Sequence, residues 1–261
     1  MMVSMIAMSA VEAQTTKVLI KTNMGNMKVV LWDDTPKHRD EFIRLVRSKH
    51  FDGTLFYRCV KNFVIQGGSS DSRNAQPGQH IGYGEEAINI DSEFRKNRFH
   101  QLGALCAPRQ PDKINMLKTS DISQFYIVRG RVIPDTILDK MELVVNIPIK
   151  KKLREMYYVP HKPELERLKE SGDKKGYAAL MREIKEKIAV EYSISDYKKF
   201  TDEQRAAYTT VGGAPELDGE YTVFGQVVEG LDVVKKINNL KVDKNDRPLT
   251  DVKIKIEIIN E

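Results

Sequence analysis

The chain has 261 residues, of which 41% are hydrophobic and 30% charged, a composition typical of a soluble globular protein with one good core and room for an insertion. The net charge of +5 comes from mixed signs rather than from one basic stripe, which argues against nucleic acid as a partner. The five histidines lack metal-ligand spacing, which argues against a bound metal.

The N-terminal run MMVSMIAMSAVEA is apolar and small, and Val11-Glu12-Ala13 resembles the cleavage site of a secretory signal. It is well short of the about 20 apolar residues that a membrane-spanning helix needs. We predict a signal peptide over residues 1–14 and an exported protein, periplasmic in a bacterium, without membrane insertion once the signal is removed. The alternative is a frayed N-terminus of a cytosolic protein.

The next elements are a hairpin and a helix. Apolar and polar residues alternate twice between Lys17 and Leu31, around a turn at residues 23–26, which predicts two paired strands. Asp34-Thr35-Pro36 then predicts a helix N-terminus, and apolar residues follow at helical spacing over 42–46.

The stretch Phe56–Gly68, FYRCVKNFVIQGG, predicts strand, tight connection and strand, because two β-prone runs flank a polar pair and Gly-Gly ends the second. Arg58 shares a strand face with apolar neighbours, and no acidic residue of the stretch pairs with it. Gln66 can hold the guanidinium through its amide oxygen without neutralising it. Such an arginine suits an amide ligand that carries an apolar ring, although an exposed edge-strand arginine would give the same pattern.

These residues resemble the signature of the cyclophilins, which are peptidyl-prolyl cis-trans isomerases. Asp33–Arg58, SQFYIV (Ser123–Val128) and LDGEYTVFGQVVEGLDVVKKI (Leu217–Ile237) resemble further blocks of that family in the same order. The resemblance implies a mainly β fold, a closed eight-stranded antiparallel β-barrel capped by two helices. The barrel would comprise residues 15–130 and 211–261, with a helical insertion at 131–210.

The resemblance also implies a site. It assigns Arg58 and Gln66 to catalysis. Positions that match the family's substrate-binding residues are Phe63, Val64, Pro108, Arg109, Gln124, Tyr126, Glu216, Leu217 and Tyr221. No covalent intermediate and no cofactor are expected, and the partners would be proline-containing unfolded or partly folded polypeptides that meet a monomeric enzyme.

Several of these positions depart from the family's pattern. Tyr57 replaces a common histidine, and Tyr126 replaces a pocket phenylalanine, a change expected to add a polar rim. Pro108 stiffens the approach to Arg109, where the family more often has an asparagine. Glu216 stands where cyclosporin-sensitive members have an aromatic residue. We therefore expect isomerase activity with altered binding.

Cys59 and Cys106 are the only cysteines, and both lie in apolar, strand-like runs. Two buried free thiols are the favoured interpretation, although export would permit a disulfide.

Within the insertion, the spacing of apolar residues predicts helices near 136–145, 163–170, 177–192 and 196–208, and Pro148 is expected to interrupt the first of them. It either packs on itself without a ligand or serves as a chaperone-like or specificity arm. The whole chain would then be an isomerase that assists the folding of exported proteins. The alternative function is a non-catalytic peptide-binding module or holdase.

Overall fold

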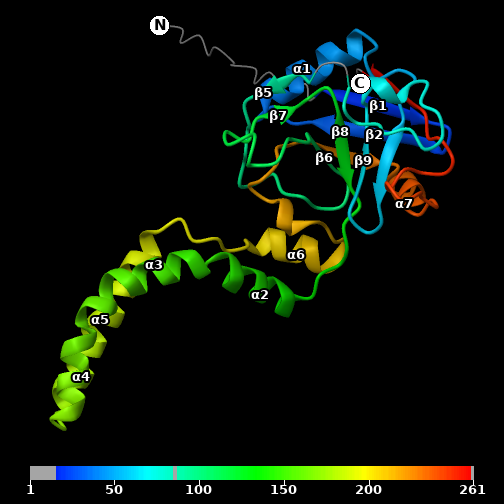
Figure 1. Cartoon of the computed structure of the whole chain (residues 1–261). Coiled ribbons are helices and arrows are strands. Elements are labelled where there is room, and N and C mark those ends of the chain that lie inside the picture. Colours follow the sequence, from blue (N-terminus) through cyan, green and yellow to red (C-terminus); the bar gives the residue numbers. More distant parts are fainter. Residues whose placement is uncertain (1–15, 85–86, 260–261) are drawn as a thin grey trace, which may run out of the picture. The chain divides into compact units, whose positions relative to one another are not determined.

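The computed structural model describes residues 16–84 and 87–259, so the predicted signal peptide lies outside the described residues. Two compact units make up the fold (Figure 1). Unit 1 combines the chain up to Val132 with the chain from Thr210 onward, and unit 2 is Ile133–Thr209. In the described ranges, none of the helices combines the length and apolarity that spanning a bilayer requires.

Eight strands of unit 1 form one antiparallel sheet in the order β10-β1-β2-β9-β6-β8-β4-β3. The strands are β1 (Lys17–Thr22), β2 (Gly25–Leu31), β3 (Phe56–Val60), β4 (Val64–Gly67), β6 (Ala104–Cys106), β8 (Phe125–Val128), β9 (Val223–Glu229) and β10 (Ile254–Ile259). A second small sheet pairs β5 (Asn89–Ile90) with β7 (Ser120–Asp121). The predicted hairpin around residues 23–26 is β1–β2.

The sheet curls strongly, but its edge strands β3 and β10 do not form a continuous ladder. They meet beside an isolated bridge between Leu55 and Lys253. There, Phe56 N donates to Val252 O at 2.9 Å. The predicted closed barrel is therefore confirmed only as a strongly curled eight-stranded antiparallel sheet with helices.

The inner face of the curl holds the main core. Alternate residues of β1 and β2, such as Val18 and Val29, are fully buried there. Phe42 of α1 (Pro36–Arg47) contacts Phe51, Phe125 and Phe224 with ring centroids 5.0–5.9 Å apart. Helix α1 packs on β9 and β10, and α7 (Leu231–Asn238) packs on β2, β3 and β4. These are the two predicted helices of the barrel.

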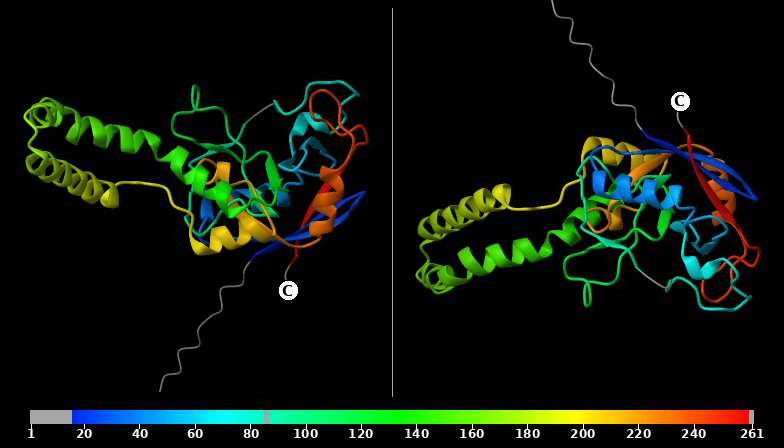
Figure 2. Two further views of the ribbon diagram at one scale, coloured as in Figure 1. Left: turned by 90° about the horizontal axis from the view of Figure 1, so that it is seen from below. Right: turned by 90° about the horizontal axis from the view of Figure 1, so that it is seen from above.

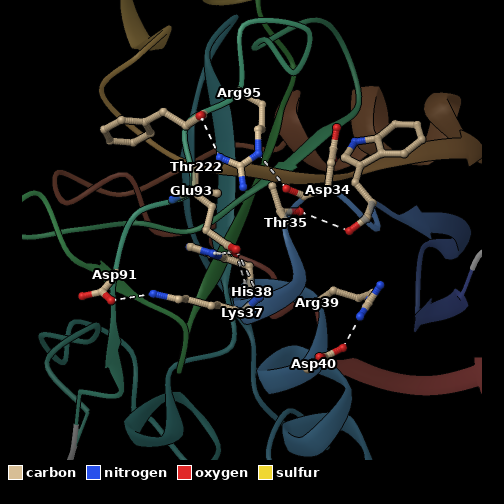
Figure 3. A network of polar contacts seen from close by, with 12 residues as sticks. Asp34, Thr35, Lys37, His38, Arg39, Asp40, Asp91, Glu93, Arg95 and Thr222 are labelled. Carbon is tan, nitrogen blue, oxygen red and sulfur yellow. Dashed lines mark hydrogen bonds and ion pairs between the residues drawn. The ribbon is translucent and has the colours of Figure 1, made fainter.

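Helix α1 begins as the sequence predicts, but its cap comes from elsewhere (Figure 3). The side chain of Thr35 makes no cap hydrogen bond. Instead, Glu93 accepts from the backbone N–H groups of Lys37 (3.3 Å) and His38 (3.0 Å). A carboxylate at a helix N-terminus also interacts favourably with the helix dipole. The loop that carries Glu93 is held in place by a further hydrogen bond, in which the backbone N–H of Glu93 donates to Thr222 Oγ1 at 3.0 Å. Glu93 thus links the N-terminus of α1 to the chain segment that contains Thr222.

The His38 side chain is fully buried beside this cap. Its Nδ1 lies 2.8 Å from Glu93 Oε2, whereas Nε2 has no hydrogen-bond partner among the described residues. The neutral tautomer with the proton on Nδ1 fits this arrangement, because an imidazolium would bury a second N–H without an acceptor. Burial accordingly lowers the pKa of His38 below its ordinary value.

Unit 2 is entirely helical in its regular structure (Figure 2). Its helices are α2 (Asp135–Val145), α3 (Ile147–Tyr157), α4 (Lys162–Glu170), α5 (Lys174–Ile194) and α6 (Asp202–Thr210). The sequence prediction missed α3, because Pro148 was taken to interrupt a helix. Proline is tolerated in the first helical turn, where its missing N–H has no partner to lose, and Pro148 lies there.

The helices of unit 2 bury few side chains. Each of α2 to α6 has one buried residue, and these are Leu138, Leu153, Leu165, Ile184 and Tyr208. Helices α3 and α4 both pack against α5. Each of these helices therefore buries only a narrow part of its surface.

Each unit brings its own chain ends together at the junction. In unit 1, Arg131 and Gly213 exchange both backbone hydrogen bonds at 3.0 Å. Gly130 has φ +56°, and a Cβ on it would lie 2.3 Å from Gly213 Cα. The backbone segments around Gly130 and Gly213 therefore approach so closely that only glycine fits at position 130. In unit 2, Ile133 N donates to Tyr208 O at 2.9 Å.

Candidate active site

The β3–β4 hairpin places Arg58 directly opposite Gln66, and Gln66 lies opposite Tyr126 on β8. The turn of the hairpin has Asn62 at φ +57° and is held by Asn238 of α7. The Asn238 amide donates to Val60 O at 2.8 Å and accepts from Asn62 N at 2.9 Å. Three neighbouring strands therefore carry the two predicted catalytic residues and one predicted substrate-binding residue.

Arg58 is held on two sides and remains accessible. Its Nη1 donates to Gln66 Oε1 at 3.4 Å, as the sequence analysis expected. Its Nε lies 3.8 Å from a carboxylate oxygen of Asp246, a residue from the loop before β10. Both side chains are exposed, at 41% and 47%, so this ion pair is weak. A guanidinium has five N–H donors, and the exposed part of this one can meet a ligand.

Asp246 lies far from the Phe56–Gly68 hairpin in the sequence, so the hairpin pattern gives no sign of this partner. The backbone brings it there: Cys59 N donates to Asp246 O at 2.8 Å, and Asp246 itself has φ +62°. No pattern in the sequence places this loop beside β3.

The predicted proline-binding residues form one apolar cluster. Val64 and Tyr126 are buried in it with Ala104 and Cys106. Phe63, Leu217 and Tyr221 are partly buried and pack against these residues. The side chains of Phe63 and Leu217 are wholly apolar, which suits a proline ring. Gln66 joins the cluster to Arg58, because it lies between Arg58 and Tyr126 in the sheet.

Tyr126 differs from what the sequence analysis expected. Its side chain is 4% exposed, and its hydroxyl lies 3.1 Å from Nε2 of the buried His100. His100 Nδ1 lies 2.9 Å from Asp218 Oδ1, which fixes a proton on Nδ1 and leaves Nε2 to accept from Tyr126. The expected polar rim is therefore wrong, since the hydroxyl belongs to a buried network.

Gln124 is also buried, at 6% exposed, and bonds to Tyr57 rather than to Arg58. Tyr57 bonds in turn to Gln66, whose Nε2 donates to the Tyr57 hydroxyl at 2.7 Å. Strict alternation would put Tyr57 on the opposite strand face from Arg58. A register shift between Phe56 and Arg58 re-aims it, as β-bulges do.

Arg109 lies beside Tyr221 of the cluster, and Pro108 directly precedes it in the chain. The Arg109 side chain is 6% exposed, and its guanidinium lies 4.9 Å from the centre of the Tyr221 ring. It donates to Glu220 O at 2.7 Å and pairs with the Glu220 carboxylate at 3.0 Å. Pro108 O accepts from Asp121 N at 2.8 Å. Arg109 thus supports Tyr221.

Glu216 lies at the rim in an exposed ion pair with Arg131, at 3.0 Å. The site is otherwise free of metal-type clusters: no group of acidic, histidine or cysteine side chains in the described ranges could hold an ion. Cys59 and Cys106 are buried free thiols, as favoured by the sequence analysis. Burial raises the pKa of the Cys59 thiol to about 12, so it is protonated and unreactive.

Comparisons with known proteins identify the family. The sequence profile of the family described as "Cyclophilin type peptidyl-prolyl cis-trans isomerase/CLD" matches residues 17–145 and 149–258. A relative from Staphylococcus saprophyticus, named as a peptidyl-prolyl cis-trans isomerase, is 27% identical over 245 residues, which cover 93% of this chain and 91% of the relative. A Staphylococcus aureus relative with the same name is 27% identical over 242 residues, or 91% of this chain and 88% of the relative.

Solved structures show the same fold. The crystal structure of a cyclophilin type peptidyl-prolyl cis-trans isomerase from Cryptosporidium parvum is 19% identical and has a TM-score of 0.53, covering 95% of this chain and 99% of that one. The structure described as being in the presence of the dipeptide Ala-Pro has a TM-score of 0.51, with coverage of 94% and 99%. Arg58, Gln66 and the apolar cluster lie on this fold, and the family profile spans both halves of unit 1. The chain belongs to the family of cyclophilin-type peptidyl-prolyl cis-trans isomerases.

Proposed function

We propose that the protein isomerises Xaa-Pro bonds of unfolded or partly folded exported polypeptides, with Arg58 as the catalytic group. The observation that carries this proposal is an accessible guanidinium, held by Gln66, next to an apolar cluster with partly uncovered Phe63 and Leu217. The dipeptide Ala-Pro, named for the Cryptosporidium parvum structure, has the chemistry that such a site would accept.

The reaction needs no nucleophile. Amide resonance sets a barrier of about 18–20 kcal/mol to rotation, and exchange without a catalyst takes tens to hundreds of seconds. Rotation ends the conjugation and gives the proline nitrogen a usable lone pair. An N–H of Arg58 that donates to this lone pair stabilises the twisted state more than the planar one, which is differential binding. Phe63, Val64, Tyr126 and Leu217 hold the ring while the bond turns.

Two substitutions of Arg58 test this role. Arg58→Ala should lower kcat/KM for an Xaa-Pro peptide at least about tenfold, because a charge-assisted hydrogen bond contributes about 1.5–3 kcal/mol. Arg58→Lys should rescue little, since an ammonium cannot reproduce the planar fork. A protease-coupled or NMR exchange assay measures the rates, and Arg47→Ala, an exposed arginine of α1, is the matched control. Wild-type rates in both Arg58 variants would remove this mechanism.

The proposal that the protein is exported rests on residues 1–13 of the sequence, most of which are apolar or small. Cell fractionation and N-terminal sequencing of the mature protein test it: we expect a periplasmic or secreted chain that begins near Gln14 or Thr15. An uncleaved chain in the cytosol would overturn this part of the proposal. Gel filtration should give a monomer. Binding of proline peptides without any turnover would instead favour the peptide-binding or holdase function.

A further inference from the structure

Behind Arg58 lies a buried chain of hydrogen bonds whose direction is set at its far end. Gln124 Nε2 donates to Gly82 O at 3.2 Å and to Asp121 Oδ2 at 3.3 Å. A backbone carbonyl and a carboxylate only accept, so they fix the Gln124 amide with its nitrogen toward them. The Gln124 oxygen must then face the other way, toward Tyr57.

The direction passes from there to the catalytic arginine. Because Gln124 Oε1 only accepts, the Tyr57 hydroxyl donates to it. The oxygen of Tyr57 is then left to accept from Gln66 Nε2, at 2.7 Å. The Gln66 amide is thereby oriented with its oxygen toward Arg58, whose Nη1 donates to it at 3.4 Å. A reversed chain would aim the Gln66 NH₂ group at the guanidinium, two donors facing each other.

We propose that Tyr57 is a positioning residue for Arg58, and that its hydroxyl transmits to Gln66 an amide orientation set by Asp121 and Gly82. This inference rests on the proposed role of Arg58 in isomerisation. Tyr57 is not expected to touch the substrate: its side chain is buried, and it acts only through Gln66.

The surroundings of Tyr57 hold the hydroxyl in place. The bulge at Phe56–Arg58 aims the side chain toward Gln66. Gly82, at φ +105°, lies against the ring, and a Cβ there would be 2.8 Å from Tyr57 Cε2. Burial also raises the pKa of the hydroxyl, so its proton stays available for donation.

Asp121 is equally fixed. Its other oxygen, Oδ1, accepts from Ser123 N (3.0 Å), Ser123 Oγ (2.6 Å) and Ile88 N (3.2 Å). In Asp121→Asn the amide oxygen is needed at that position, so its NH₂ group takes the place of Oδ2. It would then face the Gln124 NH₂ group and favour the reversed chain. One isosteric change, with Gln66, Tyr57 and Gln124 between it and Arg58, thus tests the direction itself.

The first experiment measures kcat/KM for an Xaa-Pro peptide in Tyr57→Phe. Phenylalanine keeps the ring and removes the hydroxyl, so that only the long direct contact from Gln66 Nε2 to Gln124 Oε1, at 3.5 Å, still links the two amides. We expect a fall of about tenfold, the size of one net hydrogen bond. Tyr83→Phe, at an exposed tyrosine in the neighbouring loop, is the matched control and should behave as wild type. Asp121→Asn should lower kcat/KM in the same way, with exposed Asp91→Asn as its control.

A double-mutant cycle separates positioning from general destabilisation. In an Arg58→Ala background, Tyr57→Phe and Asp121→Asn should cause no further loss, because the relay acts only through Arg58. Thermal unfolding is followed for every variant, and rates are taken where all are folded. Wild-type rates in Tyr57→Phe, or equal losses with and without Arg58, would overturn the inference. If Arg58→Ala itself had no effect, the proposed role of Arg58 would fail instead.

Discussion

Replacing Tyr126 with phenylalanine should separate stability from activity. The change keeps the ring that faces the apolar cluster and removes a hydroxyl buried against His100 Nε2 at 3.1 Å. His100 is held by Asp218 with its proton on Nδ1, so it cannot turn Nε2 to another partner without losing that bond. A buried acceptor left unsatisfied costs about 1–3 kcal/mol. For a unit of this size, that lowers the Tm by roughly 2–12 °C.

The assay compares thermal unfolding with peptide turnover in the same samples. Tyr126→Phe should unfold at a clearly lower temperature while its kcat/KM stays within about threefold of wild type, because the side chain is only 4% exposed and its hydroxyl is bonded to His100 Nε2. Tyr83→Phe controls for loss of an exposed hydroxyl. An unchanged Tm would show that the hydroxyl is not part of a buried network. A large loss of turnover with normal stability would show that it meets the substrate.

Three further predictions concern other parts of the chain. Replacing residues 133–209 with a short Gly/Ser loop should leave turnover of short peptides within about tenfold, because Arg131 and Gly213 already hold the ends together; loss of turnover in a folded deletion variant would place the insertion in the site. Cyclosporin should inhibit weakly, and Glu216→Trp should tighten inhibition measured by titration, since it removes a carboxylate from an apolar contact; tight binding by the wild type would contradict this. Because burial lowers the pKa of His38 below 6.5, the unfolded chain binds that proton more readily, and the free energy of unfolding should fall as pH drops below about 6.5. His38→Asn should flatten that part of a Tm-against-pH curve, and an unchanged curve would refute the assignment.

Much of this fold could be predicted from short-range patterns in the sequence. The alternation of residues 17–31 and the Gly-Gly end of the β3–β4 hairpin depend on neighbours a few residues apart, and both elements formed where expected. The same holds for Arg58 and Gln66, because one tight turn suffices to pair them. Only α3 was missed among the helices, since Pro148 can either end a helix or begin one.

What the sequence could not supply are contacts between distant segments. Glu93 caps a helix that begins far before it, Asp246 approaches Arg58 from the last loop, and Asp218 anchors His100 across the chain. No periodicity encodes such pairs. The orientation of Tyr57 was hidden for another reason, because a single-residue register shift reverses the strand face on which a side chain lies.

The joined ends of the insertion have a consequence for folding. While residues 133–209 are unstructured, unit 1 must close a long loop to bring Arg131 to Gly213, which costs roughly 2 kcal/mol more than closing a loop of a few residues. Once the insertion folds, its own bond between Ile133 and Tyr208 has already brought those ends together. Folding of either unit therefore lowers the entropic cost of bringing together the chain ends of the other. The two units are therefore coupled through the conformational entropy of the chain that connects them.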